Sequence, residues 1–494
     1  MLTQRLAGGA GLLLITSFFG RFLALLAQVV TGLVLSDGDF GIYAAAVGLQ
    51  TIAGITRGGD AQTYLVTLPP SSRRFRVGTV FWVSNLLFLI GIVPMLVFAP
   101  FVAASFEEPI LVPLFWILSA TLLTAPARYV LQAKLNARLE FRANAKGVLI
   151  CDVTTYALMV VLALTIRSPL ALAIPTLAGC LVHLLYLCRV TSPRWSDFTL
   201  RRKFILPVLH QLRWLIAVAA MMSLWTSGDY AVAEFLVPAA ILGTYYFGYQ
   251  LAVQPGRLFT SNLTSVLVPV VCRVMHEPER LRSAIKRLLG TGGFTIAIVN
   301  LCMFAVIASL EQVIWNGRWS GVVFAVQILS VGLVYSSILS IITSPFMAER
   351  KYLETFVCNA VRAAGLIIGA GIGASIGGGT VESMAAWVGG SMIATSLVAI
   401  FWITRRYGLE GFGAVLHLVR CTAPVIIAGL IAAIIDRNLL DLLGEGRLNA
   451  AVSLAASGAA FLLMVSASLL LIPTETKKET WSIISSRIPG LRSR

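Results

Sequence analysis

Charged residues are scarce in this sequence. Only 12% of the 494 residues are charged, while 58% are hydrophobic, whereas ordinary soluble domains carry about 25% charged residues. A water-soluble protein could not bury this much apolar surface, and a disordered chain needs low hydrophobicity and high charge. The composition therefore excludes both classes and indicates a protein that is solvated by a lipid bilayer.

Residue sets that carry enzymatic chemistry are also missing from the sequence. The four histidines are scattered without metal-ligand spacing, no Gly-x-x-x-x-Gly-Lys-Ser/Thr phosphate loop occurs, and no nucleophile has a partnered base. The seven cysteines all lie in or at the ends of apolar runs, so we expect no disulfide. The sequence thus predicts a protein that is not an enzyme and that holds neither a metal ion nor another cofactor.

Long hydrophobic runs dominate what is present. A membrane-spanning helix takes about 20 apolar residues, and the runs predict fourteen such helices. The expected spans are 8–35, 40–66, 77–100, 110–131, 145–166, 170–190, 212–236, 239–270, 288–310, 321–347, 353–374, 381–403, 413–435 and 448–472.

Positive charge is distributed unevenly between the two sets of connecting loops. The net charge is +16, and 29 of the 38 lysines and arginines fall in the even-numbered connections and the two ends, against four in the odd-numbered connections. Cytoplasmic loops carry such an excess. We therefore expect both termini in the cytoplasm and a basic tail that suits an anionic membrane surface, and we expect no nucleic-acid partner.

A weak internal repeat divides the chain. Leu35–Tyr43 (LSDGDFGIY) and Val237–Tyr245 (VPAAILGTY) share a turn, an apolar residue, Gly, one residue and Tyr at an offset of 202 residues. Six helices lie within this offset, so the two halves would have the same orientation in the membrane. The expected domains are an N-terminal six-helix bundle at 1–195, a C-terminal six-helix bundle at 205–405, two additional helices at 413–472 and a basic cytoplasmic tail at 473–494.

Several segments resemble one known family of transporters. Leu33–Ala46 (LVLSDGDFGIYAAA) is similar to the first hairpin of Wzx-type polysaccharide flippases, Gly228–Leu258 to their seventh and eighth helices, and Leu131–Ala145 to the basic link after their fourth helix. The chain departs from the family pattern at Glu234 and at residues 57–60, which are more charged than usual. The resemblance implies an all-α polytopic membrane protein of the multidrug/oligosaccharidyl-lipid/polysaccharide exporter superfamily, with two pseudo-symmetric six-helix bundles and two extra helices.

The same resemblance implies a function. Such a protein moves a polyprenyl-diphosphate-linked oligosaccharide across the bacterial cytoplasmic membrane by alternating access, for exopolysaccharide, O-antigen or capsule synthesis. Its expected partners are the lipid-linked oligosaccharide, membrane lipids, a polysaccharide polymerase and a chain-length regulator. Two other functions stay open: a cation-coupled multidrug exporter, whose cavity should be acidic, and a non-transporting scaffold of a glycan-assembly complex, in which no single cavity charge should matter.

Ionisable residues inside the spans are the candidates for the functional site. Each charge at a helix centre costs about 2.5–3.5 kcal/mol, so these side chains should face a wet cavity or one another. Arginine binds phosphate oxygens in a bidentate fashion and stays charged, whereas aspartates could couple transport to H⁺ or Na⁺. The candidates for substrate binding are Arg21, Arg57, Arg257 and Arg362, and those for ion coupling are Asp60, Asp152 and Asp229.

Structural roles compete with these assignments. Arg57 and Asp60 are three residues apart and could neutralise each other. Asp152 could pair with a loop cation, and Arg128 lies near enough to a helix end to reach the interface. The aromatic cluster at 245–249 could stack on sugars, but helix packing is the favoured explanation.

Overall fold

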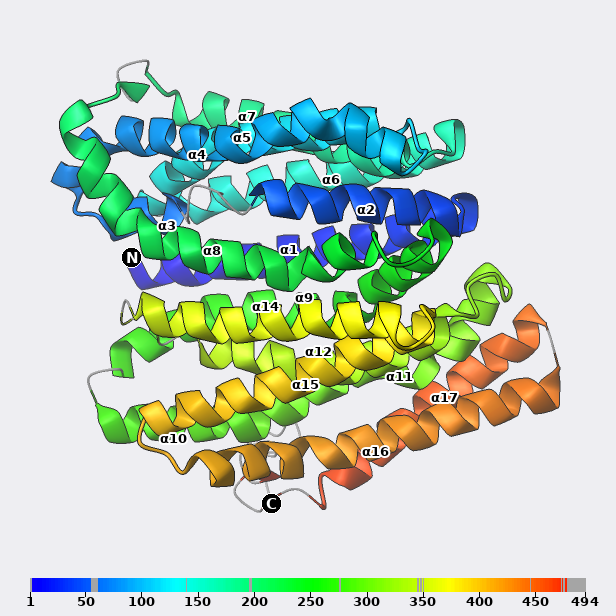
Figure 1. Cartoon of the computed structure of the whole chain (residues 1–494). Helices are drawn as coiled ribbons and strands as arrows, with labels where there is room; N and C mark the ends of the chain where they lie inside the picture. Colours follow the sequence, from blue (N-terminus) through cyan, green and yellow to red (C-terminus); the bar gives the residue numbers. More distant parts are fainter. Residues whose placement is uncertain are drawn as a thin grey trace. The chain divides into compact units, whose positions relative to one another are not determined.

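The computed structural model describes residues 2–54, 61–138, 140–194, 198–274, 277–343, 346, 349, 351–444, 446–471, 473, 476 and 477. Every element in these ranges is a helix (Figure 1). The helices up to residue 233 are α1 (Leu2–Val34), α2 (Asp37–Ala53), α3 (Ala61–Thr67), α4 (Pro70–Ser105), α5 (Leu111–Ala137), α6 (Phe141–Ile166), α7 (Leu170–Thr191), η3 (Arg202–Phe204) and α8 (Ile205–Ala233). The later ones are α9 (Ala239–Val274), α10 (Pro278–Arg287), η4 (Leu288–Gly292), α11 (Gly293–Trp315), α12 (Val322–Ile342), α14 (Tyr352–Ser375), α15 (Val381–Arg406), α16 (Gly411–Leu443) and α17 (Arg447–Ser468).

Twelve of these helices are long and apolar enough to cross a membrane, and each coincides with one of the expected spans. The remaining two expected spans are 40–66, which contains residues outside the described part, and 239–270, whose second half lacks described side chains. Apolar side chains also point outward: Val97, Phe98 and Phe101 on α4 are 66%, 59% and 73% exposed. Such surface is stable in lipid rather than in water, so the predicted all-α polytopic membrane protein is confirmed.

The helices form two compact units. Unit 1 comprises residues 1–246 and 352–374, and unit 2 comprises residues 247–351 and 375–494. In unit 1, α1 packs on α6, α5 and α6 both pack on α7, and α2 packs on α8; in unit 2, α11 packs on α12, α16 and α17 (Figure 1). The two units are defined by helix packing, whereas the expected domains follow the order of the helices along the chain. The expected domain boundaries at 195–205 and 405–413 therefore stay a prediction.

The two repeated segments lie against each other within unit 1. A Cβ atom at Gly41 would overlap the backbone carbonyl of Ala239, and one at Gly243 would overlap the backbone carbonyl of Asp37. Residues 41 and 243 differ by 202, as do residues 37 and 239, which is the offset of the sequence repeat. Each half therefore makes the same contact with the other, as an approximate two-fold axis between α2 and the start of α9 requires. The absence of a side chain at both glycines permits this close approach.

Local hydrogen bonds fix the entry into α2. Ser36 precedes the helix and accepts from the backbone N–H of Asp39 at 3.1 Å, while the Asp39 carboxylate accepts from the backbone N–H of Ser36 at 2.9 Å. This capping box satisfies two helix-end donors that would otherwise lack partners. It sets the start of the helix so that Gly41 faces α9.

A buried carboxylate in unit 2 ties three helices together. Asp436 on α16 is 1% exposed and accepts from the backbone N–H of Ser309 on α11 at 3.0 Å and from the Ser453 hydroxyl on α17 at 3.1 Å. The Ser309 hydroxyl also donates to it. The expected span ended at residue 435, but the helix continues to Leu443 because these donors satisfy the acid.

Replacing Asp436 with alanine should destabilise the protein by about 3 kcal/mol or more. The hydroxyl and the backbone N–H of Ser309 would lose their acceptor, whereas the Ser453 hydroxyl keeps its bond to the backbone carbonyl of residue 436 at 3.0 Å. Each unsatisfied buried group costs about 1–3 kcal/mol. Thermal unfolding of the purified protein measures the change. Asp441→Ala is the matched control, because Asp441 lies on the same helix with an exposed side chain. Equal melting temperatures for the two variants would contradict a structural role for Asp436.

Candidate functional site

A polar cavity of about 310 Å³ lies between the helices of unit 1. It is lined by residues of α2, α5 and α7 and by Tyr246, which lies two turns into α9. The polar or aromatic residues among them are Tyr43, Gln50, Thr121, Arg128, Tyr129, Thr176, Cys180 and Tyr246. The cavity therefore combines one cation with hydroxyl, amide and aromatic groups inside a membrane-spanning unit.

Hydrogen bonds along α5 order the polar side of the cavity. Gln50 reaches across from α2 and donates to the Leu118 carbonyl at 3.0 Å, with the Thr121 hydroxyl 3.4 Å from the same nitrogen. One turn further, the Thr124 hydroxyl donates to the Thr121 carbonyl at 2.7 Å. It also accepts from Nε of Arg128 at 3.2 Å. Gln50 is thus held by α5, and Thr124 orients Arg128 on the same helix.

Arg128 is the positive charge of this cavity. Its side chain is half-buried, and no carboxylate pairs with it in the part of the chain that the structure describes. The titratable groups with which it interacts are Cys151 and His183 on the neighbouring α6 and α7. Neither supplies a negative charge in its neutral form. An uncompensated guanidinium attracts an anion, and its planar fork matches phosphate oxygens.

Aromatic rings also line the cavity. Tyr246 makes edge contacts with Tyr43 and Tyr230, with ring centroids 5.9 and 5.2 Å apart. The other aromatic residues of the cluster at 245–249 are buried in helix contacts: Tyr245 and Phe247 are 0% exposed and Tyr249 is 4% exposed. Packing therefore accounts for three members of the cluster, and Tyr246 is the member that reaches the cavity.

Two of the candidate charges from the sequence lie together on α1 and α6. Arg21 is half-buried, and its guanidinium interacts electrostatically with the Asp152 carboxylate. The Asp152 side chain also packs so tightly on α1 that a Cβ atom at Gly20 would overlap it. Opposite charges on neighbouring helices offset part of the cost of placing each of them in the membrane.

Asp229 and Arg362 each have a close partner inside unit 1. Asp229 on α8 is 0% exposed, and its Oδ2 accepts from the Tyr245 hydroxyl at 2.8 Å. Arg362 on α14 is 2% exposed, and its guanidinium lies 3.9 Å from the centre of the Trp225 ring on α8. The Asn359 side chain accepts from Arg362 at 3.5 Å. These contacts join helix to helix, and neither charge lines the cavity around Arg128.

The remaining candidates are placed elsewhere. Arg257 is half-buried on α9 in unit 2. Arg57 and Asp60 lie outside the described residues. The assignments of all seven charges to substrate binding or ion coupling stay predictions. The sequence predicts an interfacial position for Arg128, so this residue is not among the predicted site residues. Its signal in the sequence is weak: an arginine one turn after Thr124, with no acid within a turn on either side.

Comparison with known proteins identifies the family. The sequence profile of the family described as "Polysaccharide biosynthesis protein" matches residues 33–324. The chain is 22% identical to the lipopolysaccharide biosynthesis protein WzxC of Escherichia coli (strain K12) over 350 residues, which cover 68% of each protein.

Solved structures show that the fold is shared with transporters. The lipid II flippase MurJ in an inward closed conformation superimposes with a TM-score of 0.71 at 14% identity, covering 92% of this chain and 98% of that one. An inward-facing multidrug resistance transporter of the MATE family gives a TM-score of 0.59 at 15% identity, covering 78% of this chain and 94% of that one. Because the family profile spans more than half of the sequence, the chain belongs to the polysaccharide biosynthesis protein family, and the resemblance seen in its motifs is confirmed.

Proposed function

We propose that this protein is a flippase that moves a polyprenyl-diphosphate-linked oligosaccharide repeat unit across the bacterial cytoplasmic membrane, for exopolysaccharide, O-antigen or capsule synthesis. The observation that carries the proposal is the cavity in unit 1, where Arg128 faces hydroxyl and aromatic groups without a paired carboxylate. A diphosphate needs a fixed cation, and a glycan needs hydrogen-bonding and ring-stacking groups. Membership of the polysaccharide biosynthesis family supports the same substrate class.

The mechanism follows from where each part of the substrate is stable. The diphosphate would bind the free N–H groups of Arg128, and the sugars would contact Gln50, Thr121 and the tyrosines, while the polyprenyl tail stays in the bilayer. Alternating access then exposes the cavity to one side of the membrane at a time. Outward movement of two negative charges is favoured by an inside-negative potential, by about 2.3 kcal/mol per charge per 100 mV.

Aspartates remain the proposed coupling sites for H⁺ or Na⁺. Asp152 has the positive charge of Arg21 nearby, whereas Oδ1 of Asp229 is buried and has no hydrogen-bond partner among the described residues. Asp229 is therefore the better of the two described candidates. We propose no other cofactor and no enzymatic activity. A polymerase and a chain-length regulator are the proposed protein partners.

A strain that lacks this protein tests the function directly. Lipid-linked repeat units should accumulate on the cytoplasmic leaflet and glycan should disappear from the cell surface, and the wild-type protein should restore both. A multidrug exporter would instead change the accumulation of cationic dyes and leave surface glycan intact. The uncompensated Arg128 disfavours that alternative, because it would repel an organic cation.

The proposed orientation, with both termini in the cytoplasm, predicts which loops reach the outside. In a cysteine-free background, cysteines at Ser168 and Gly377 should react with a membrane-impermeant thiol reagent in intact cells, and cysteines at Ser72 and Ser283 should react only after the cells are opened. Ser168 and Gly377 lie in connections between spans, Ser72 lies just before the span that begins at Phe75, and Ser283 lies exposed on α10. Labelling of Ser72→Cys or Ser283→Cys in intact cells would reverse the proposed topology.

A further inference from the structure

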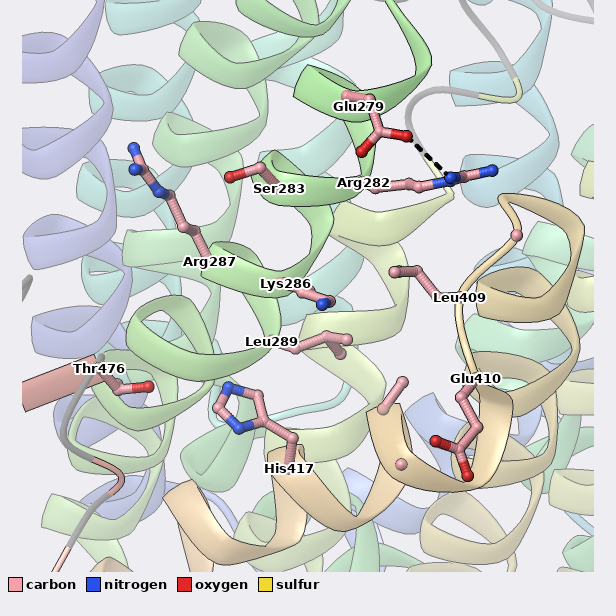
Figure 2. Close-up of a pocket in the computed structure, with 13 residues that line it drawn as sticks. Glu279, Arg282, Ser283, Lys286, Arg287, Leu289, Leu409, Glu410, His417 and Thr476 are labelled. Atoms are coloured by element: carbon pink, nitrogen blue, oxygen red, sulfur yellow. Dashed lines mark hydrogen bonds and ion pairs between the residues drawn. The ribbon is translucent and has the colours of Figure 1, made fainter.

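A second polar hollow lies in unit 2, far larger than the cavity around Arg128. It has a volume of about 950 Å³ and is lined by α10 and η4, by residues 408–410, by the first two turns of α16 and by Thr476 (Figure 2). We refer to it as the α10–α16 groove. Pockets that bind small molecules commonly have volumes of about 300–1,000 Å³, so a ligand headgroup fits.

One wall of the groove is an amphipathic helix at the end of a membrane span. Leu281 and Ile285 of α10 are 5% and 1% exposed, while Arg280, Ser283 and Lys286 point to the other side. Through η4 the helix continues directly into the spanning helix α11. A short basic helix in this position lies at the level of the lipid headgroups.

Arg282 holds this wall in place. Its Nη1 contacts the Glu279 carboxylate at 3.1 Å, and its Nε donates to the Tyr407 carbonyl, at the end of α15, at 3.0 Å. Arg282 thus connects α10 to the end of α15, and its charge is paired with an acid of its own helix. The Lys286 ammonium, by contrast, is exposed and has no acidic partner among the described residues. Arg287 adds a further positive charge to the lining.

The start of α16 forms the opposite wall and adds positive potential. The first backbone N–H groups of a helix lack intrahelical partners. Glu410 precedes this 33-residue helix, and its side chain makes no capping bond to them. Helix N-termini of this kind attract anions. The Glu410 carboxylate itself lies over the first turn, 3.0 Å from the position of a Cβ atom at Gly413. This internal acid would compete with an incoming anion.

The floor of the groove carries two further polar groups. Nε2 of His417 and the hydroxyl of Thr476 would lie 2.8 and 2.7 Å from a Cβ atom at Gly290. The missing side chain at Gly290 therefore leaves room for both groups. Cations, a helix N-terminus and a hydroxyl on one concave surface are the combination that binds a phosphate group.

Apolar surface beside the groove points to a lipid rather than a soluble phosphate. Phe412 and Leu416 lie on the same first two turns of α16 and are 68% and 36% exposed. A phospholipid could place its phosphate in the groove and its acyl chains along this surface. We propose that the α10–α16 groove binds the headgroup of an anionic phospholipid, as a site separate from the cavity around Arg128 and independent of the proposed transport function.

Native mass spectrometry of the full-length protein in detergent tests this site. Titration with phosphatidylglycerol should give one tightly bound lipid, at least about tenfold tighter than phosphatidylcholine. Lys286→Gln should weaken phosphatidylglycerol binding about fivefold, the ratio expected for one cation near an anionic headgroup. Lys286→Arg should preserve it, and Glu410→Gln should strengthen it about fivefold by removing the competing carboxylate.

The matched control is Arg280→Gln, on the same helix. Arg280 is equally exposed but pairs with Glu277 at 2.9 Å and does not line the groove. Its replacement should change phosphatidylglycerol binding less than twofold. An equal loss of binding in Arg280→Gln and Lys286→Gln would mean that general surface charge, and not a specific site, attracts the lipid. Displacement of the lipid by inorganic phosphate at millimolar concentration would assign the groove to a free phosphate, and unchanged binding in Lys286→Gln would overturn the proposal.

Discussion

Replacing Arg128 with glutamine should lower glycan export about 100-fold while the protein still accumulates in the membrane. The guanidinium is the only cation in the cavity of unit 1 and has no paired carboxylate in the described part of the chain. A hydrogen bond to a charged group contributes about 1.5–3 kcal/mol, and the diphosphate would lose at least one such bond. A neutral side chain is also easier to bury, so insertion should not suffer. The measurement is surface glycan relative to the amount of membrane-inserted protein.

Companion variants separate charge from shape. Arg128→Lys keeps the charge but not the planar fork, so it should retain partial export. Thr124→Val removes the acceptor that orients Nε and should reduce export less than Arg128→Gln does. Arg138→Gln is the matched control, because this exposed arginine lies just beyond the same helix. Normal export by Arg128→Gln would exclude a role of this cavity in binding the diphosphate.

Hydrophobic length made the spans predictable from the sequence. A run of about 20 apolar residues has no stable alternative to a helix across the bilayer, because its backbone polar groups must be satisfied internally. Twelve expected spans accordingly coincide with helices of the structure. The end of α16 was not predictable in this way. Asp436 looked like the first residue beyond the span, and only its donors Ser309 and Ser453, distant in the sequence, allow the helix to continue.

The roles of the membrane charges depended on partners that no local pattern reveals. Arg362 lies on Trp225, which is 137 residues earlier in the chain, and Arg21 faces Asp152 across two helices. In each case the sequence correctly indicated that a charge in the bilayer needs compensation, but not by which group. Arg128 is the opposite case. Its distance from the helix centre favoured an interfacial position, whereas the structure places it in a cavity lined by residues of α2, α5 and α7.

Alanine at Gly41 or at Gly243 should destabilise the protein by about 3 kcal/mol or more. In both positions the new methyl group would overlap backbone atoms, of Ala239 or of Asp37, and a backbone carbonyl cannot rotate away as a side chain can. Overpacking of ordinary cores costs about 1–3 kcal/mol, so a backbone clash should reach or exceed the upper end. Gly38→Ala is the matched control, because its methyl group would only touch the Ser36 hydroxyl at 3.8 Å.

The double variant distinguishes a two-fold contact from two unrelated ones. If residues 41 and 239 and residues 243 and 37 meet across one axis, a single displacement of α2 from α9 relieves both overlaps. Gly41→Ala/Gly243→Ala should then cost little more than either single variant, so the coupling energy in the double-mutant cycle should be nearly the cost of one single variant, about 3 kcal/mol. Thermal unfolding of the four proteins measures this coupling. Strictly additive losses of stability would mean that the two contacts respond independently. The repeated segments would then not be coupled across one axis in unit 1.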